Sequence, residues 1–195
     1  MKKLLFALLL TPVVATAQLR DSVRIKTDIY EVIYSEKLES PRWVKYTVLC
    51  PNGTASRSGM DFYTNDSVKT SSNEDYVKNE WDKGHMAPVA DFNCDKEMLR
   101  KTFSYLNCAL QNQYLNRGVW RMLEEQERVW AQKETTTVTI NLVFDKTSYT
   151  LPTGATVPSG FLKTICLEKS GKKIKFYFPN MTPTKEKYTE YEIKK

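Results

Sequence analysis

His85 is the only histidine of this 195-residue chain, and it lies in the polar stretch WDKGHMAPVADF. An imidazole has an ordinary pKa of about 6.5, so at neutral pH it can take a proton from water. Asp82 precedes it by three residues and can bond a ring nitrogen or lie beside a metal ion. Gly84 permits a sharp turn and Pro88 stiffens the exit, so we expect an uncrowded, presented ring. A buried structural histidine is the alternative.

A single histidine excludes several kinds of hydrolase. Zinc proteases of the H-E-x-x-H type and Cys2His2 zinc sites each need two histidines. The sequence also contains no G-x-S-x-G elbow of the serine hydrolases. The remaining economical mechanism is one general base beside a metal ion, which stabilises the negative charge that develops when the base activates water.

Oxygen ligands for such a metal follow later in the chain. Asn107 lies in a predicted strand, and Asn116 begins a predicted helix that also carries Glu124 and Arg128. At about 100° per residue, the three helical positions fall within roughly 120° of one face. Because about 12 Å of rise separates Asn116 from Glu124, we expect Asn116 to bind the ion directly and Glu124 to hold its waters. Few protein ligands and many waters are typical of Mg²⁺.

Each of these residues also has a simpler interpretation. Asn116 could only cap the helix, and Glu124 with Arg128 four residues later could only form a solvated ion pair. Trp120 is expected in the core. The joint occurrence of these residues with His85 favours a site.

The motifs together resemble a known family. The segments DKGHMAPVADF, TFSYLNCALQNQYLNRGVW and MLEEQER are similar to D-R-G-H-x-A-P, N-x-x-P-Q, L-N-x-G-x-W and L-E-x-x-x-R. These linked motifs are typical of the sugar-nonspecific DNA/RNA endonucleases of the ββα-metal superfamily. The likeness extends over about residues 29–180 with matching order and spacing. Four linked motifs are a specific signal, whereas D-x-G-H alone would be weak.

The resemblance implies a role for each matching residue. His85 would be the general base, and Asn107 would help to place the base and the phosphate. Asn116 would bind the metal directly, while Glu124 and Asp82 would hold it through water, with Glu124 counted among the catalytic residues. Three basic residues would bind substrate phosphate: Lys83, Arg128 and Arg57, the last also stabilising the transition state.

Three features depart from the family pattern. Lys83 replaces an arginine, which keeps the charge but loses bidentate phosphate geometry, so rate or substrate preference could differ. Leu110 replaces the proline before Gln111, a change that we expect to affect only a turn. The chain ends at Lys195, where relatives often continue into a further helix.

The elements that must position these residues predict a single α+β domain. Aromatic and β-branched runs predict strands, and apolar residues at three- and four-residue spacing predict helices. We expect a turn around Ser40 and Pro41 and a polar surface excursion over 61–79. The fold class is α+β, with a central, mostly antiparallel sheet and, by resemblance, a ββα-metal active-site motif. The predicted strands span 30–36, 43–50, 105–110, 135–144, 161–168 and 173–179, and the predicted helices span 95–103 and about 114–132.

Residues 1–17 predict a signal peptide. Lys2 and Lys3 precede the apolar run LLFALLLTPVVA, and Ala15-Thr16-Ala17 forms an A-x-A cleavage site. We therefore expect residues 18–195 to form the nuclease domain and to be exported to the periplasm or the cell exterior, without stable membrane insertion. A membrane anchor is the alternative, for which the run is short. Removing the leader lowers the net charge from +6 to +4, which permits a polyanionic partner without establishing one.

The four cysteines leave their pairing open. Their separations of 44, 14 and 58 residues do not resemble the close pairs of structural zinc sites. Export would permit disulfides, with three connectivities for two bridges. Four small buried side chains are an equal alternative. The residues are Cys50, Cys94, Cys108 and Cys166.

These inferences predict a secreted, metal-dependent, sequence-nonspecific endonuclease. It would bind the phosphate backbone of DNA and RNA, use Mg²⁺ with Mn²⁺ as a substitute, and, as the resemblance implies, leave 5′-phosphates. No recognition helix or zinc finger is evident, which fits nonspecific recognition. A toxin nuclease is one rival, for which we see no delivery domain. A catalytically weak or inactive binding module is the other, and the intact set of His85, Asn107, Asn116 and Glu124 argues against it.

Overall fold

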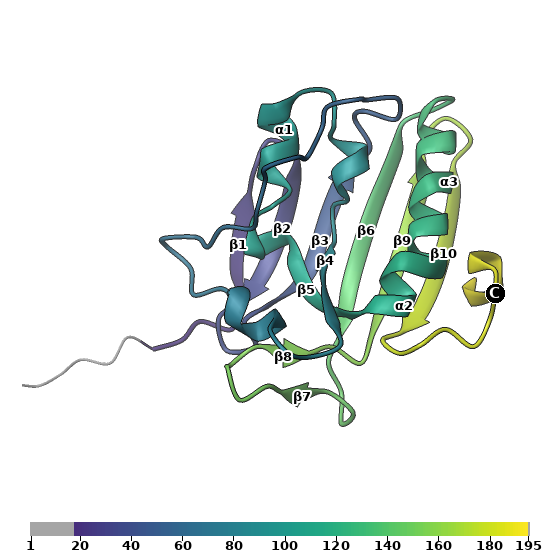
Figure 1. Cartoon of the computed structure of the whole chain (residues 1–195). Helices are drawn as coiled ribbons and strands as arrows, with labels where there is room; N and C mark the ends of the chain where they lie inside the picture. The colour runs from purple at the N-terminus through teal and green to yellow at the C-terminus, as the bar shows by residue number, and fades with distance from the viewer. Residues whose placement is uncertain (1–17, 195) are drawn as a thin grey trace, which may run out of the picture.

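Six antiparallel strands form the central sheet. The computed structural model describes residues 18–194, so the predicted signal peptide and Lys195 lie outside the described residues. The strand order is β1-β2-β3-β6-β9-β10, and all neighbours are antiparallel (Figure 1). The predicted α+β fold with a mostly antiparallel central sheet is confirmed. The strands are β1 (Val23–Lys26), β2 (Tyr30–Ser35), β3 (Ser40–Thr47), β6 (Thr136–Val143), β9 (Gly160–Leu167) and β10 (Lys172–Pro179).

A smaller unit carries the family-like motifs. Strands β4 (Trp81–His85) and β5 (Cys108–Asn112) form an antiparallel pair in which His85 lies opposite Cys108. Two strands followed by a helix form the ββα arrangement that the resemblance implies. The helical part consists of α2 (Gln113–Leu115), a π-helical turn η4 (Asn116–Trp120) and α3 (Arg121–Ala131).

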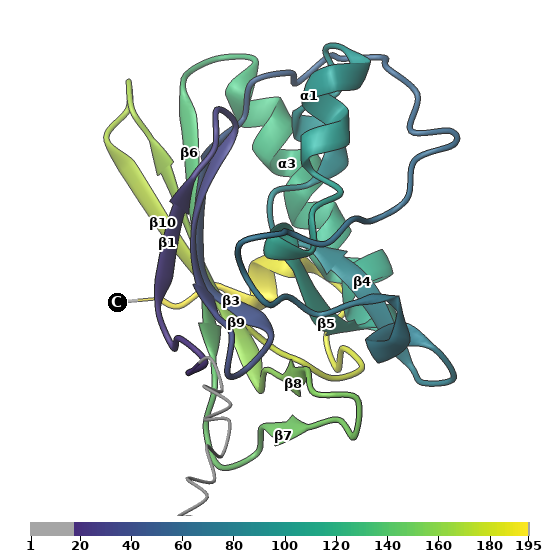
Figure 2. The same ribbon diagram turned by 90° about the vertical axis from the view of Figure 1, so that its left-hand side faces the viewer.

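The core lies between this unit and one face of the sheet. Figure 2 shows α1 (Lys96–Lys101), α3, β4 and β5 on the same side of the sheet. Strand β6 alternates buried Val138 and Ile140 with the less buried Thr139, as the two-residue period of a strand requires. Trp120 is fully buried, as predicted, with its ring 5.3 Å from that of Phe161 on β9.

The structure also contains elements that the sequence pattern did not predict. Strand β1 has only four residues, too few for a clear pattern, and β4 is short and mostly polar, so the stretch expected to form a turn around His85 begins as a strand. The expected turn around Ser40 and Pro41 is wrong: both residues belong to β3, and the chain reverses before them, where Glu39 has a φ of 47°. The remaining short elements are β7 (Tyr149–Thr150), β8 (Thr156–Val157), η2 (Val89–Asp91), η3 (Tyr105–Asn107) and η5 (Tyr188–Tyr191).

The segment 61–79 runs mostly over the surface, as expected, but it is anchored at several points. It contains the 3-10 helix η1 (Asn73–Tyr76), which begins with a capping box between Ser72 and the buried Asp75. Asp75 also accepts a hydrogen bond from the backbone N–H of Ala155, 80 residues later in the chain. Long-range polar contacts of this kind are not visible in local sequence periodicity.

One disulfide joins Cys50 to Cys94. Cys108 is free and buried, and Cys166 is free and half-buried. The disulfide ties the loop that carries Arg57 to the segment after η2, and Asn93 reinforces this link by donating to the carbonyl of Gly53 at 2.9 Å. Among the helices of residues 18–194, none has the length and apolar character that a bilayer crossing requires.

Candidate active site

A cleft of about 710 Å³ contains seven of the eight predicted site residues. Strand β4, the turn η4, helix α3 and the loop before η1 contribute its walls. It contains five cationic side chains and three acidic ones, as expected for a site that binds a polyanion with a cation. The predicted residues in the cleft are Arg57, Asp82, Lys83, His85, Asn116, Glu124 and Arg128.

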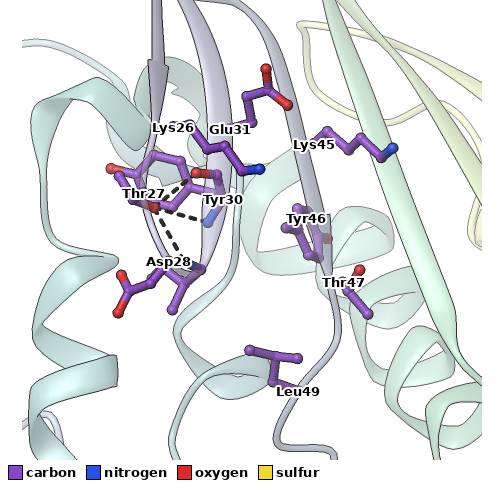
Figure 3. Close-up of a pocket in the computed structure, with 10 residues that line it drawn as sticks. Lys26, Thr27, Asp28, Tyr30, Glu31, Lys45, Tyr46, Thr47 and Leu49 are labelled. Atoms are coloured by element: carbon purple, nitrogen blue, oxygen red, sulfur yellow. Dashed lines mark hydrogen bonds between the residues drawn. The ribbon is translucent and has the colours of Figure 1, made fainter.

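A second cavity of about 340 Å³ lies beside the turn between β1 and β2 (Figure 3). Thr27 there bonds its own turn, donating to the carbonyl of Tyr30 and accepting from its N–H. Both lysine and carboxylate side chains line this cavity, and neither His85 nor any motif residue does. The chemistry therefore concentrates in the larger cleft.

His85 ends strand β4 between two aromatic rings. The centroid of its imidazole lies 4.7 Å from that of Phe62 and 5.1 Å from that of Phe103. Its Nε2 is buried and has no hydrogen-bond partner in the described structure. Burial lowers the pKa of His85 to about 3, with a smaller contribution from the positive charge of Arg57. The ring is therefore more crowded than expected, although His85 is only half-buried and lines the cleft. The imidazole is neutral, as a base must be.

A glycine is needed at position 84 for close packing and not for the predicted sharp turn. It lies within β4, and its φ is not positive. A Cβ at this position would lie 2.4 Å from Oε1 of Gln111 and 2.6 Å from its Cβ. Gly84 therefore makes room for the buried Gln111 of the neighbouring strand.

Asn107 lies outside the cleft and holds the backbone after His85. Its Nδ2 donates to the carbonyls of Ala87 and Thr102 at 2.8 and 3.0 Å, and its Oδ1 accepts from the N–H of Ala87 at 2.7 Å. The N–H of Met86 also donates to the backbone carbonyl of Asn107. Asn107 thus positions the segment that carries the base, while its fully buried amide is occupied and does not reach a phosphate.

Leu110 does not lie in a turn, contrary to expectation. It is a buried residue of β5, opposite Lys83 on β4. Its carbonyl accepts a hydrogen bond from Nδ2 of Asn180 at 3.0 Å. The replacement of proline therefore affects a strand of the site.

Asn116 is not the helix cap. Asn112 caps the helix instead, because its Oδ1 accepts from the N–H groups of Tyr114 and Leu115. After Asn116 the chain leaves the helical region at Gly118, with φ −102° and ψ −118°. The segment from Asn116 to Glu124 is therefore not a straight helix, and both side chains reach the same cleft.

Asp82 links Asn116 to an arginine that the motif comparison did not single out. Oδ2 of Asp82 accepts from Nδ2 of Asn116 at 2.9 Å. The guanidinium of Arg117 donates from Nε to Oδ2 at 2.8 Å and from Nη2 to Oδ1 at 2.6 Å. Since Nδ2 of Asn116 faces the carboxylate, its Oδ1 is left free of Asp82 and can serve as a cation ligand.

Glu124 lies above a layer of buried charges. Burial raises the pKa of its carboxyl to about 7, although the positive charge of Lys163 acts in the opposite direction. Lys163 on β9 and Glu127 on α3 are both fully buried, with 2.8 Å between Nζ and Oε1. Tyr46 donates to the other oxygen of Glu127 at 2.9 Å.

The basic side chains of the cleft have different partners. Arg128 pairs with the buried Asp91 at 3.0 Å rather than with Glu124, so the interpretation as a simple i, i+4 ion pair is wrong. Lys83 lies 3.5 Å from the exposed Asp61, with its ammonium over the ring of Phe62. Arg57 is exposed at the cleft wall.

Several residues of the site were missed from the sequence. Phe62 and Phe103 flank the base, Asp91 anchors Arg128, and Arg117 binds Asp82. Arg117 could have been noticed, because it follows Asn116 directly within LNRGVW. The aromatic pair has no comparable signal, since both residues reach His85 from distant loops.

The donor set fits a hard cation that keeps most of its water. Asn116, Glu124 and Asp82 supply oxygen atoms only, whereas Zn²⁺ prefers nitrogen and sulfur. Within residues 18–194 no cluster of three or more His, Cys, Asp or Glu side chains could enclose an ion. The residues therefore fit an ion bound through one or two protein oxygens and through water.

The sequence model of the family described as DNA/RNA non-specific endonuclease matches residues 11–194. The chain belongs to this family. Its members hydrolyse phosphodiester bonds, so the cleft around His85 is the candidate active site of a nuclease.

Curated relatives match about half of the chain. "Nuclease EXOG, mitochondrial" of Danio rerio is 34% identical over 105 residues, which are 51% of this chain and 31% of the relative. "Endonuclease G, mitochondrial" of Bos taurus is 31% identical over 105 residues, 51% of this chain and 35% of the relative. The matched regions thus span about a third of these relatives.

A solved structure shares the fold. The crystal structure of the EndoG/EndoGI complex matches with a TM-score of 0.74 at 22% identity, covering 88% of this chain and 80% of the other. At this identity the likeness concerns the fold alone, which is the α+β fold described above.

Proposed function

We propose that the protein is an exported, Mg²⁺-dependent, sequence-nonspecific endonuclease that cleaves DNA and RNA to products with 5′-phosphates. The observation that carries this proposal is one cleft containing a neutral imidazole and the oxygen donors Asn116 and Glu124. Membership of the DNA/RNA non-specific endonuclease family supports the reaction class.

His85 is the proposed general base. It takes a proton from a water molecule, and the resulting hydroxide attacks phosphorus in line with the P–O3′ bond, which breaks to leave phosphate on the 5′ oxygen. Within residues 18–194 the buried Nε2 has no hydrogen-bond partner, and Phe62 and Phe103 flank the ring. Asn107 positions the backbone behind the ring and takes no part in proton transfer.

Asn116 would hold the cation directly, and Glu124 would hold it through water. When bound, the cation supplies positive charge that stabilises the phosphate and the leaving 3′ oxygen in the transition state. Mn²⁺ has the same preference for oxygen ligands and is the expected substitute.

The basic residues of the cleft support binding through phosphate. Arg57, Lys83 and Arg128 all line the cleft and would contact backbone oxygens. Such contacts carry no base information, which agrees with nonspecific cleavage of both DNA and RNA.

Export is proposed from the N-terminal sequence and supported by the disulfide. Residues 1–17 have the pattern of a cleaved signal peptide, and disulfides such as Cys50–Cys94 persist mainly in oxidising compartments. Residues 18–195 would then be the working nuclease domain.

The test is cleavage of supercoiled plasmid and of a structured RNA by the purified protein. We expect cleavage of both with Mg²⁺ as the only metal, loss with EDTA, and 5′-phosphate ends that a ligase joins without prior phosphorylation. Cleavage that persists in EDTA would contradict the metal requirement. Nucleic-acid binding without cleavage at any metal concentration would favour the inactive binding module.

A further inference from the structure

The carboxylate of Asp82 is fully engaged by protein donors. It makes two hydrogen bonds with the guanidinium of Arg117 and a third with the amide of Asn116. A carboxylate in this state has little negative charge to offer a hydrated cation. The family resemblance assigns Asp82 to the cation, so the same oxygens have two competing partners.

Arg117 itself is mostly exposed to water and has a single anchor. Its side chain is 68% exposed, whereas that of Asp82 is 18% exposed. Its only side-chain hydrogen bonds within residues 18–194 are the two to Asp82. An exposed arginine with a single anchor can exchange that anchor for another anion at low cost.

A phosphate of the nucleic-acid backbone is the anion that competes for Arg117. Both Arg117 and Asp82 line the cleft together with the proposed phosphate-binding residues. A guanidinium binds phosphate in the same bidentate geometry in which it binds a carboxylate. Lys83, which stands where the family has arginine, can offer only a single ammonium. Arg117 can therefore restore a bidentate phosphate contact at this site.

We propose that Arg117 is a phosphate-binding residue that Asp82 holds in reserve until cation and substrate arrive together. This inference rests on the proposed function. In the free protein, Arg117 neutralises Asp82 and weakens cation binding. In the substrate complex, Arg117 moves to a backbone phosphate, and Asp82 becomes available to the waters of the cation. Cation and nucleic acid then bind cooperatively. The cation draws Asp82 away from Arg117, and the phosphate draws Arg117 away from Asp82.

The experiment measures the two ligands separately on intact protein. Mg²⁺ binding is followed by calorimetry without nucleic acid, and binding of a short labelled DNA duplex is followed by anisotropy in EDTA over a range of salt. Arg117→Gln should bind Mg²⁺ roughly two- to fivefold more tightly, the range for loss of one exposed charge pair. The same variant should bind DNA more weakly, with a salt slope smaller by about 1. Arg117→Lys should recover the salt slope but not the full affinity.

A variant background and a control test whether Arg117 and the cation compete for Asp82. In an Asp82→Asn background, Arg117→Gln should no longer change Mg²⁺ affinity, because the competition is already absent. Arg24→Gln is the matched control, since Arg24 is 65% exposed and pairs with Glu31 at 2.7 Å outside the cleft.

Opposite changes in the two affinities would support the inference. Unchanged or weaker Mg²⁺ binding by Arg117→Gln would overturn it, because Arg117 would then only orient Asp82. An unchanged salt slope would overturn the phosphate contact. Plasmid cleavage by the wild-type protein tests the proposed function independently. If both ligands bind as expected but no cleavage occurs, only the proposed nuclease function is rejected.

Discussion

Two ion pairs near helix α3 differ in their contact with water. Lys163 and Glu127 pair below the helix with both side chains fully buried, whereas Arg117 and Asp82 pair at the mouth of the cleft, where the arginine is mostly exposed. A buried pair cannot lose one member without leaving an uncompensated charge in the core. An exposed pair can be exchanged for water or for a ligand at little cost.

The difference divides the site into two layers. The structural layer contains the buried pair Lys163–Glu127, and the reactive layer contains the residues that line the cleft, among them Arg117 and Asp82. Lys163 also lies 4.3 Å from the ring centre of Trp120, which belongs to the turn between Asn116 and α3. The buried pair therefore supports the segment that sets Asn116 relative to Glu124. The residues that line the cleft remain accessible to the cation, water and phosphate.

Breaking the buried pair should have the largest effect on stability. Lys163→Ala leaves the carboxylate of Glu127 unpaired, and we expect a loss of about 3–5 kcal/mol in the free energy of unfolding. Denaturant unfolding measures it. The double variant Lys163→Met with Glu127→Leu should recover most of the loss, because no lone charge remains. A loss below about 1 kcal/mol for Lys163→Ala would contradict the assignment of this pair to the structural layer.

Glu124 lies between the two layers and should set the pH dependence. Its pKa is raised to about 7, so the carboxylate that a cation needs forms only as the pH rises through this value. Mg²⁺ affinity should therefore increase with pH up to about 7, and the acid limb of kcat/KM should move to lower pH as Mg²⁺ is increased. His85 has a pKa of about 3 and stays neutral over this range.

The raised pKa of Glu124 also predicts how the stability of the fold changes with pH. A carboxyl whose folded pKa exceeds its unfolded value stabilises the fold below about pH 4.5, and this contribution is lost as the pH rises through about 7. Metal-free Glu124→Gln should lack that loss, while Glu125→Gln, its exposed neighbour, should retain it. Thermal melts from pH 4 to 8 without metal test this, and identical profiles for Glu124→Gln and the wild type would contradict it.

The smallest effect is expected at the exposed pair. Arg117→Gln should leave the melting temperature nearly unchanged, because the guanidinium is solvated with or without its partner. A large drop in melting temperature, measured beside the Arg24→Gln control, would mean that Arg117 belongs to the structural layer and would remove the contrast between the two pairs.

The sequence predicted the large sheet better than the site. Strands β2, β6, β9 and β10 are rich in β-branched and aromatic residues, and β6 alternates in burial along its length, so residue type and period indicated them. Strand β4 reads WDKGH, which has no apolar alternation, and it forms because β5 pairs with it. Pairing between distant segments is a tertiary effect that local patterns do not contain.

Seven of the eight predicted site residues line one cleft, because the motif spacing reflects the geometry of the site. The features that the sequence did not indicate depend on packing. The amide of Asn107 bonds the backbone, Gly84 makes room for Gln111, and two phenylalanines flank the ring of His85. The non-helical backbone at Gly118 likewise means that a straight-helix calculation does not describe the relation of Asn116 to Glu124, both of which line the cleft.

The central claim is that His85 serves chemistry although its ring is packed between two phenylalanines. His85→Ala is therefore measured on one preparation for melting temperature, DNA affinity in EDTA and cleavage rate with Mg²⁺. Cys108→Ala, opposite His85 on β5, controls for disturbance of the strand pair. We predict a loss of about 10²- to 10⁴-fold in kcat, with DNA affinity and folding nearly intact. A destabilised His85→Ala protein whose folded fraction cleaves DNA at the wild-type rate would contradict the claim.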